Sequence, residues 1–214
     1  MHVLMRPRAR IAGSLIVALA LGIAALASGP AAAQVPDPKD QCKQGGFAGF
    51  LDPSTGLPFR TQAECVKFVA QGGTLVPAVD LAVTKSCTRT TPATVECTVS
   101  VRNAGPGTAI IPASAMLLKD SVGLSSGTVI GVFASAAPGY SEAISSCSGT
   151  DQCTITYKAD GPQTLAPNQA VTVTQYINFT STGATLTHAA TADPHGAVTE
   201  LNEGNNRVTV TTLP

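Results

Sequence analysis

The segment TVECTVSVRN, residues 94–103, alternates polar and apolar side chains. Val95, Cys97, Val99 and Val101 fall on one side of an extended chain, and the residues between them fall on the other. A period of two residues is typical of a β-strand that has one face in a hydrophobic core and one face in water. The segment therefore predicts a half-buried strand of an antiparallel sheet.

The same alternation recurs on both sides of this segment, interrupted by clusters of Gly, Pro and Asn that are typical of turns. It predicts strands at 79–84, 153–158, 170–179, 185–191 and 207–212, with weaker signals at 110–118 and 128–134. The stretch GPQTLAPNQ, residues 161–169, is expected to be a loop. No helical segment of crossover length lies between the strands, so we expect about eight short strands in a mainly β, antiparallel β-sandwich at residues 77–214.

A different pattern precedes these strands, in the segment CKQGGFAGFLDPSTGLPFRTQAECVKFVAQGG at residues 42–73. Thr61 and Glu64 have the spacing of a capping box, which predicts a helix that ends at Gly72-Gly73. Four phenylalanines are interpreted as a miniature core, with an exposed contact patch as the alternative: Phe47, Phe50, Phe59 and Phe68. We expect residues 34–76 to form a small helical module that depends on a disulfide, because about 30 residues bury too little apolar surface.

Residues 1–33 have the order of a secretory signal peptide. Three arginines precede an apolar run at residues 11–27, and small residues follow up to Ala33. Cleavage after Ala33 removes three of the 13 basic residues and none of the 13 acidic ones, which leaves a net charge of about −3. The alternative is a retained membrane anchor. The mature protein is thus predicted to be secreted, extracellular or periplasmic, with no membrane span and no basic stripe that would bind nucleic acid.

Export makes disulfides the expected state of the six cysteines. Pairing each cysteine with its neighbour closes three short loops, and the chain-entropy model assigns each loop about 2–3.5 kcal/mol of stability. Zinc is the alternative ligand, but no pair has C-x-x-C spacing and histidines are scarce, so we predict no metal site. The predicted disulfides join Cys42 with Cys65, Cys87 with Cys97, and Cys147 with Cys153.

A polar cluster in ELNEGNNRVTVTT, residues 200–212, precedes the last predicted strand. Asn and Gly tolerate left-handed backbone angles, and Asn side chains bond nearby backbone, so we interpret the cluster as a turn. The alternative is a weak calcium site made by Asp193, Glu200 and Glu203, because calcium accepts irregular sets of oxygen ligands. The turn is preferred because the spacing does not follow an EF-hand loop.

The sequence shows no arrangement of nucleophile, base and orienting group, so we expect no enzyme activity, no catalytic residue and no cofactor. His188 shares a strand face with Leu186 and Ala190, which indicates packing, and His195 lies in a turn.

The expected function is binding of a protein or glycan at the cell surface, through loops or an exposed strand edge. The loop at 146–153, closed by a disulfide, is a rigid candidate, although its bridge can equally serve to protect the loop. A small hydrolase with an unrecognised site and a structural component of the envelope are the alternatives.

The phrases VDLAVTKS, TVECTVSVRNAGPGTA, LAPNQAVTVT and HAATAD…VTELNEGNNRVTVTT follow one another from residue 79 to residue 212. Their order resembles the bacterial immunoglobulin-like surface repeats, namely the cell-adhesion-related domain found in bacteria (CARDB) and the similar domain of unknown function eleven. The resemblance implies an immunoglobulin-like β-sandwich in an extracellular setting, but it transfers no ligand. The segment at 42–73 is similar to a short cysteine-bracketed segment of secreted bacterial proteins, which implies no particular activity.

Overall fold

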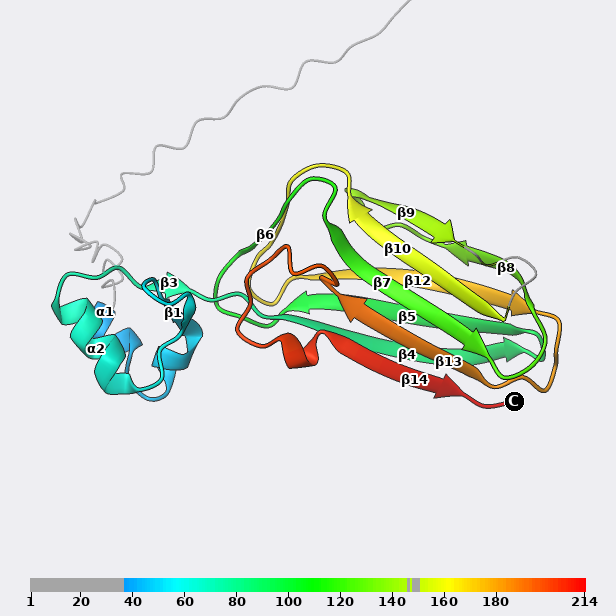
Figure 1. Ribbon diagram of the computed structural model, residues 1–214, viewed down its shortest axis with the longest axis horizontal. Coiled ribbons are helices and arrows are strands. Elements are labelled where there is room, and N and C mark those ends of the chain that lie inside the picture. The colour runs from blue at the N-terminus through cyan, green and yellow to red at the C-terminus, as the bar shows by residue number, and fades with distance from the viewer. Residues whose placement is uncertain (1–36, 146, 148–150) are drawn as a thin grey trace, which may run out of the picture. The chain divides into compact units, whose positions relative to one another are not determined.

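The computed structural model describes residues 37–145, 147 and 151–214, and the predicted signal peptide lies outside the described residues. Two antiparallel sheets form the carboxy-terminal part of the chain (Figure 1). Buried side chains of both sheets share one hydrophobic core. The first sheet has the order β4 (Leu81–Thr91), β5 (Thr94–Asn103), β12 (Ala170–Phe179) and β8 (Val129–Ala134). The second has the order β14 (Arg207–Thr212), β13 (Leu186–Ala192), β7 (Met116–Leu124), β10 (Gln152–Ala159) and β9 (Tyr140–Ser145). The predicted fold class, a mainly β protein with an immunoglobulin-like sandwich, is confirmed.

Strand β5 contains the segment TVECTVSVRN and lies inside its sheet, between β4 and β12. Its four predicted inward residues are at most 1% exposed: Val95, Cys97, Val99 and Val101. Cys97 lies opposite Cys87 of β4 on one side and opposite Gln175 of β12 on the other. The alternation therefore identified the buried face of the strand, while its partners come from both near and distant parts of the chain.

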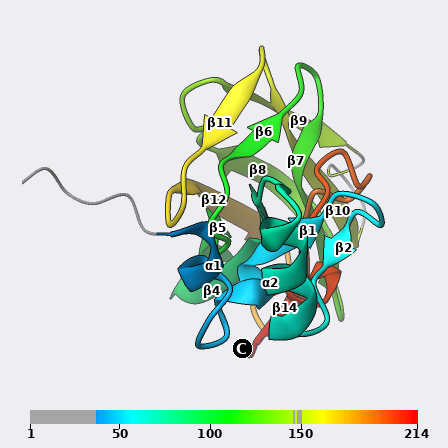
Figure 2. The same cartoon turned by 90° about the vertical axis from the view of Figure 1, so that its left-hand side faces the viewer.

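The described part of the sandwich contains eleven strands, from β4 to β14, where the sequence predicted about eight. The predicted strand at 110–118 is two strands, β6 (Ala109–Ile111) and β7, because Pro112 has no N–H to donate and a turn follows it. The predicted loop at 161–169 contains β11 (Gln163–Leu165), which pairs with β6 in a separate two-stranded sheet (Figure 2). Strand β9 was also not predicted. Strands β6 and β11 have only three residues each, and β9 does not alternate regularly between apolar and polar residues, so local alternation gives little sign of them.

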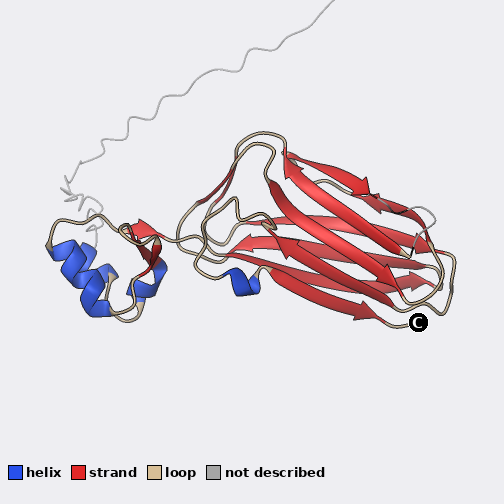
Figure 3. Ribbon diagram, in the orientation of Figure 1, coloured by secondary structure: helices blue, strands red, loops and turns tan. Residues whose placement is uncertain are grey.

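The amino-terminal module is built from short helices and strands, which Figure 3 shows in blue and red. They are α1 (Pro38–Gln41), the 3₁₀ turn η1 (Gly46–Gly49), β1 (Phe50–Asp52), β2 (Leu57–Pro58), α2 (Gln62–Ala70) and β3 (Val76–Pro77). The three strands form a sheet in the order β2-β1-β3, which the sequence did not indicate. Thr61 caps α2 by accepting a hydrogen bond from the Glu64 N–H at 3.2 Å, as predicted, while the Glu64 carboxylate accepts from the N–H of Arg60 at 3.1 Å.

The core of this module consists of Cys42, Phe59 and Cys65, which are at most 5% exposed. Phe47, Phe50 and Phe68 are half-buried and pack against these three residues. The phenylalanines thus form the predicted miniature core and not an exposed patch.

The structure contains three disulfides, which join the same neighbouring cysteines that the sequence analysis paired: Cys42–Cys65, Cys87–Cys97 and Cys147–Cys153. Within the described residues, no helix is long and apolar enough to cross a membrane. The three disulfides agree with an extracellular or periplasmic location.

Candidate functional site

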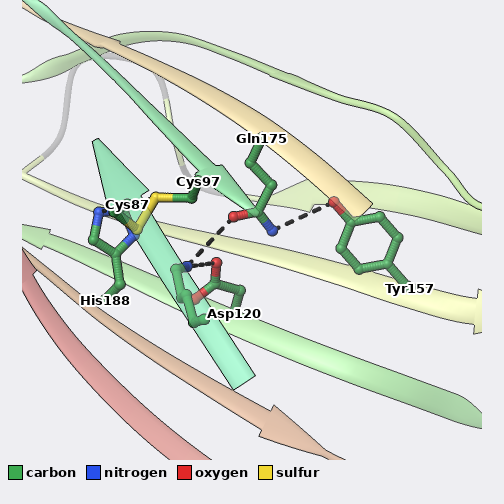
Figure 4. A network of polar contacts seen from close by, with 7 residues as sticks. Cys87, Cys97, Asp120, Tyr157, Gln175 and His188 are labelled. Carbon is green, nitrogen blue, oxygen red and sulfur yellow. Dashed lines mark hydrogen bonds and ion pairs between the residues drawn. A yellow bond between two sulfur atoms is a disulfide. The ribbon is translucent and has the colours of Figure 1, made fainter. Parts of the chain in front are cut away.

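A polar seam crosses the centre of the sandwich core, and its seven residues come from six strands of both sheets. The first sheet contributes Lys85 and Cys87 from β4, Cys97 from β5 and Gln175 from β12, and the second contributes Asp120 from β7, Tyr157 from β10 and His188 from β13. Figure 4 shows the disulfide and the side chains of Asp120, Tyr157, Gln175 and His188 close together.

The centre of the polar seam is an ion pair between Lys85 and Asp120, both of whose side chains are 0% exposed. The Lys85 amine donates to Asp120 Oδ2 and also to Gln175 Oε1 at 3.4 Å. Gln175 in turn donates through Nε2 to the Tyr157 hydroxyl at 3.3 Å. Burial lowers the pKa of Lys85, against the opposing attraction of Asp120, and burial raises the pKa of Tyr157 to about 12.

His188 lies at the other end of the polar seam, against the Cys87–Cys97 disulfide. Its two ring nitrogens are 3.8 and 3.7 Å from Cys97 Sγ, and the residue is 0% exposed, as are Leu186 and Ala190 on the same strand face. Burial, assisted by the charge of Lys85, lowers the pKa of His188 to about 3. The imidazole is packed in the core, as the sequence predicted, and its low pKa keeps it neutral at ordinary pH.

Cys87, Cys97 and His188 bring three metal-ligand atoms within 4.8 Å of one another. The ligand form of cysteine is the thiolate, whereas both sulfurs here belong to a disulfide. The three residues could therefore hold a soft cation only after the disulfide has been reduced.

The predicted turn at 200–206 uses its polar groups to bond the chain itself. Glu200 accepts from the Leu81 N–H and from Asn206 Nδ2, and Glu203 accepts from the same Asn206 nitrogen at 2.7 Å. Asn202 caps the short helix η2 (Glu203–Asn205) by accepting from the Gly204 N–H at 2.9 Å. Burial, the largest effect, raises the pKa of Glu200 to about 7.

Asp193, the third residue of the alternative calcium site, binds within its own loop. Its two carboxylate oxygens accept from the N–H groups of Ala197 at 2.9 Å and Val198 at 2.7 Å. His195 lies in this loop and is exposed, in the turn environment that the sequence predicted. Asp193 thus bonds the backbone of its own loop, as turn residues do, while Glu200 bonds the backbone of Leu81 and Glu203 bonds the side chain of Asn206.

A hollow of ≈ 230 Å³ in the amino-terminal module is lined by three charged residues, Asp52, Arg60 and Glu64. Asp52 accepts from the hydroxyl of Ser54 at 2.7 Å and from its N–H at 2.9 Å, and these bonds lower the pKa of Asp52. The Glu64 carboxylate accepts from the Arg60 N–H, as described above. Both carboxylates thus accept hydrogen bonds from neighbouring residues of the module.

An exposed apolar surface lies at one edge of the first sheet, where β8 is the last strand in the order. Phe133 is 65% exposed, Ile130 is 59% exposed, and Tyr176 of the adjacent β12 is 42% exposed. Phe133 and Tyr176 are directly opposite each other in the strand register. We call these three residues the aromatic edge.

The predicted loop site at 146–153 falls partly on residues 146 and 148–150, which lie outside the described residues. Its disulfide is present, and Cys153 is buried at the start of β10. A binding role for this loop stays a prediction.

The sequence analysis missed four residues of the polar seam, Lys85, Asp120, Tyr157 and Gln175. The alternation of side chains along a strand could have indicated them. Lys85 lies two and four positions after the buried Val83 and Leu81, so it faces the same side of the strand. Gln175 likewise occupies an inward position within the alternation of β12. A polar residue at an inward position is the signal of a buried polar group that needs a partner.

No family model matches this chain, and no curated protein matches it in sequence. Its structure is similar to a CARDB domain from Pyrococcus furiosus solved in complex with di-metal ions, at 21% identity and a TM-score of 0.38, over 65% of this chain and 96% of that one. It is also similar to part of DesR, a β-glucosidase from Streptomyces venezuelae, at 14% identity and a TM-score of 0.29, over 75% of this chain and 20% of that one. A third likeness is the GAE domain of yeast GGA1, at 9% identity and a TM-score of 0.20, over 63% of this chain and 91% of that one.

With TM-scores this low, these similarities indicate no function for the chain. A CARDB domain is among these structures, and membership of that family stays a prediction. The resemblances to the domain of unknown function eleven and to the cysteine-bracketed segment stay predictions.

Proposed function

We propose that this chain is an exported, non-catalytic binding protein whose sandwich recognises an extended segment of another protein at the aromatic edge. The observation that supports this proposal is the 65% exposure of Phe133 on the edge strand β8, beside Tyr176. Large apolar side chains grouped on a surface mark interaction sites more often than scattered ones do.

The edge position of β8 favours a peptide in extended form as the partner. Every second N–H and C=O of an edge strand points away from its sheet and can pair with an added strand. Phe133 and Tyr176 would then supply side-chain contacts next to this backbone pairing, as aromatic residues do at the centres of many interfaces. A partner with alternating apolar residues fits this surface best.

A binding assay with the mature protein tests the proposal, using an array of extended peptides and an array of bacterial glycans. The test variant is Phe133→Ala, and the matched control is Ile110→Ala, which removes another exposed apolar side chain at 67% exposure. We expect peptides to bind the wild type and the control equally, and Phe133→Ala to bind them about 30-fold more weakly.

Equal peptide binding by all three proteins would overturn the proposed surface. Binding to glycans alone, lost in Phe133→Ala, would replace the peptide with the glycan alternative. The hydrolase alternative is tested with a panel of hydrolase substrates. Hydrolysis of one of them by the wild type, lost in Asp52→Asn or Glu64→Gln, would support an active site at the hollow of the small module.

A further inference from the structure

The contact between Lys85 and Asp120 joins the two sheets at the middle of the core. Lys85 belongs to β4 of the first sheet, Asp120 belongs to β7 of the second, and 35 positions separate them in sequence. Both side chains are 0% exposed, so no solvent separates the amine from the carboxyl group.

Hydrogen bonds in the core do not fully replace the hydration that this ion pair loses on burial. Two charges lose their hydration when they are buried, and their attraction repays this cost only when the remaining lone pairs also find hydrogen bonds. Asp120 Oδ1 is buried without a hydrogen-bond partner in the part of the chain that the structure describes. A neutral group at this position would avoid the cost of a buried carboxylate with one unpaired oxygen.

We propose that Lys85 Nζ and Asp120 Cγ become joined by an intramolecular isopeptide bond. In the buried pair, the ammonium transfers one proton to the carboxylate, which gives a neutral amine and a neutral carboxylic acid. The amine lone pair then attacks Cγ, the C–OH bond breaks, and the hydroxyl group leaves as water with a proton from the nitrogen. One amide bond and one water molecule form, no group is oxidised or reduced, and no further reactant is needed.

The surroundings of the pair favour this reaction. Fixed contact between reacting groups gives effective concentrations of about 10⁵ M or more, and the dry core disfavours the reverse hydrolysis. Burial lowers the pKa of Lys85, which favours the nucleophilic amine.

Neighbouring groups are placed to hold the amine and then the product amide. Gln175 Oε1 accepts from the amine and can accept from the N–H of the amide that replaces it. Tyr157 fixes Gln175 through its hydroxyl. The neutral His188 and the Cys87–Cys97 disulfide complete the polar seam without adding a charge.

Mass spectrometry of the purified mature protein, denatured, reduced and alkylated, tests the proposal. We expect a mass lower by one water molecule than the alkylated sequence requires. Trypsin should leave the bond after Lys85 uncut and yield one branched species that joins residues 68–89 to residues 120–158. Lys85→Arg, which keeps the charge but cannot form the amide, should restore the full mass, whereas the control Lys119→Arg should keep the deficit.

The wild-type measurement decides the proposal even if Lys85→Arg fails to fold. A full mass with cleavage after Lys85 would overturn it and leave a buried ion pair. A water deficit traced to a cyclic imide at Asp120, with Lys85 free, would overturn it as well.

Discussion

The amino-terminal module and the β-sandwich depend on their disulfides to different degrees. Among the described residues of the module, the buried core consists of Cys42, Phe59 and Cys65, so one bridge supplies two of these three side chains. The sandwich buries a continuous apolar core between two sheets, and its Cys87–Cys97 bridge lies at the margin of a polar seam. One bridge spans 23 positions and the other 10, so the chain-entropy model gives them contributions of the same order. Whether a bridge is essential then depends on how much stability the rest of its region supplies.

The largest expected effect comes from the polar seam of the sandwich. Asp120→Ala leaves the Lys85 amine buried without its partner, and we expect it to lower the free energy of unfolding by about 3–5 kcal/mol. Urea unfolding followed by circular dichroism measures this loss. Asp160→Ala, at an exposed position, is the control and should change the stability by less than about 0.5 kcal/mol.

If Asp120→Ala were as stable as the control, the core would tolerate an unpaired amine. The contact between Lys85 and Asp120 would then contribute nothing to the free energy of unfolding, whether it is an ion pair or an amide.

The second prediction concerns the module. Replacing Cys42 and Cys65 together by Ala removes a bridge between residues 23 positions apart, which contributes about 3 kcal/mol in the chain-entropy model. We expect the module to unfold while the sandwich stays folded, because the small core of the module supplies too little stability to replace the bridge. Trypsin should then cut rapidly after Arg60 and Lys67, in and beside helix α2. Resistance of these two sites equal to that of the wild type would contradict the prediction.

The third prediction applies the same change to the sandwich. Replacing Cys87 and Cys97 together by Ala removes a bridge between residues 10 positions apart, so we expect a loss of about 2–3 kcal/mol. The sandwich should nevertheless remain folded at room temperature, with a lower melting temperature and an unchanged far-ultraviolet spectrum. Complete unfolding of this variant would remove the contrast between the two regions.

The smallest expected effect is a dependence of stability on pH. Burial raises the pKa of Glu200 from its ordinary value of 4.5 to about 7, so the folded state disfavours the charged form. The corresponding stabilisation is complete below pH 4.5 and is lost as the pH rises through 7, by about 1 kcal/mol after allowance for solvent screening. Unfolding curves at pH 4.5 and pH 8 should differ less in Glu200→Gln than in the wild type. Glu142→Gln, which changes an exposed carboxylate, should keep the wild-type difference.

Much of the candidate site could not be read from local pattern. Alternation placed Cys97 and His188 inside, and turn chemistry accounted for Asn202 and Glu203. Lys85 and Gln175 occupy inward positions of their strands, and a polar residue at such a position indicates a partner in the core. The identity of that partner, Asp120, could not be predicted, because the contact requires the packing of two sheets whose strands lie far apart in sequence.

The sequence by itself determined which side chains face the core, because the direction of a side chain alternates along a strand regardless of what pairs with it. It also determined the capped helix α2 and the turn at 200–206, since caps and turns are bonds between residues a few positions apart. Only the tertiary structure decided the order of the strands, the pairing of β6 with β11 and the meeting of Lys85 with Asp120. These contacts depend on how the two sheets pack, and no short window of sequence contains that information.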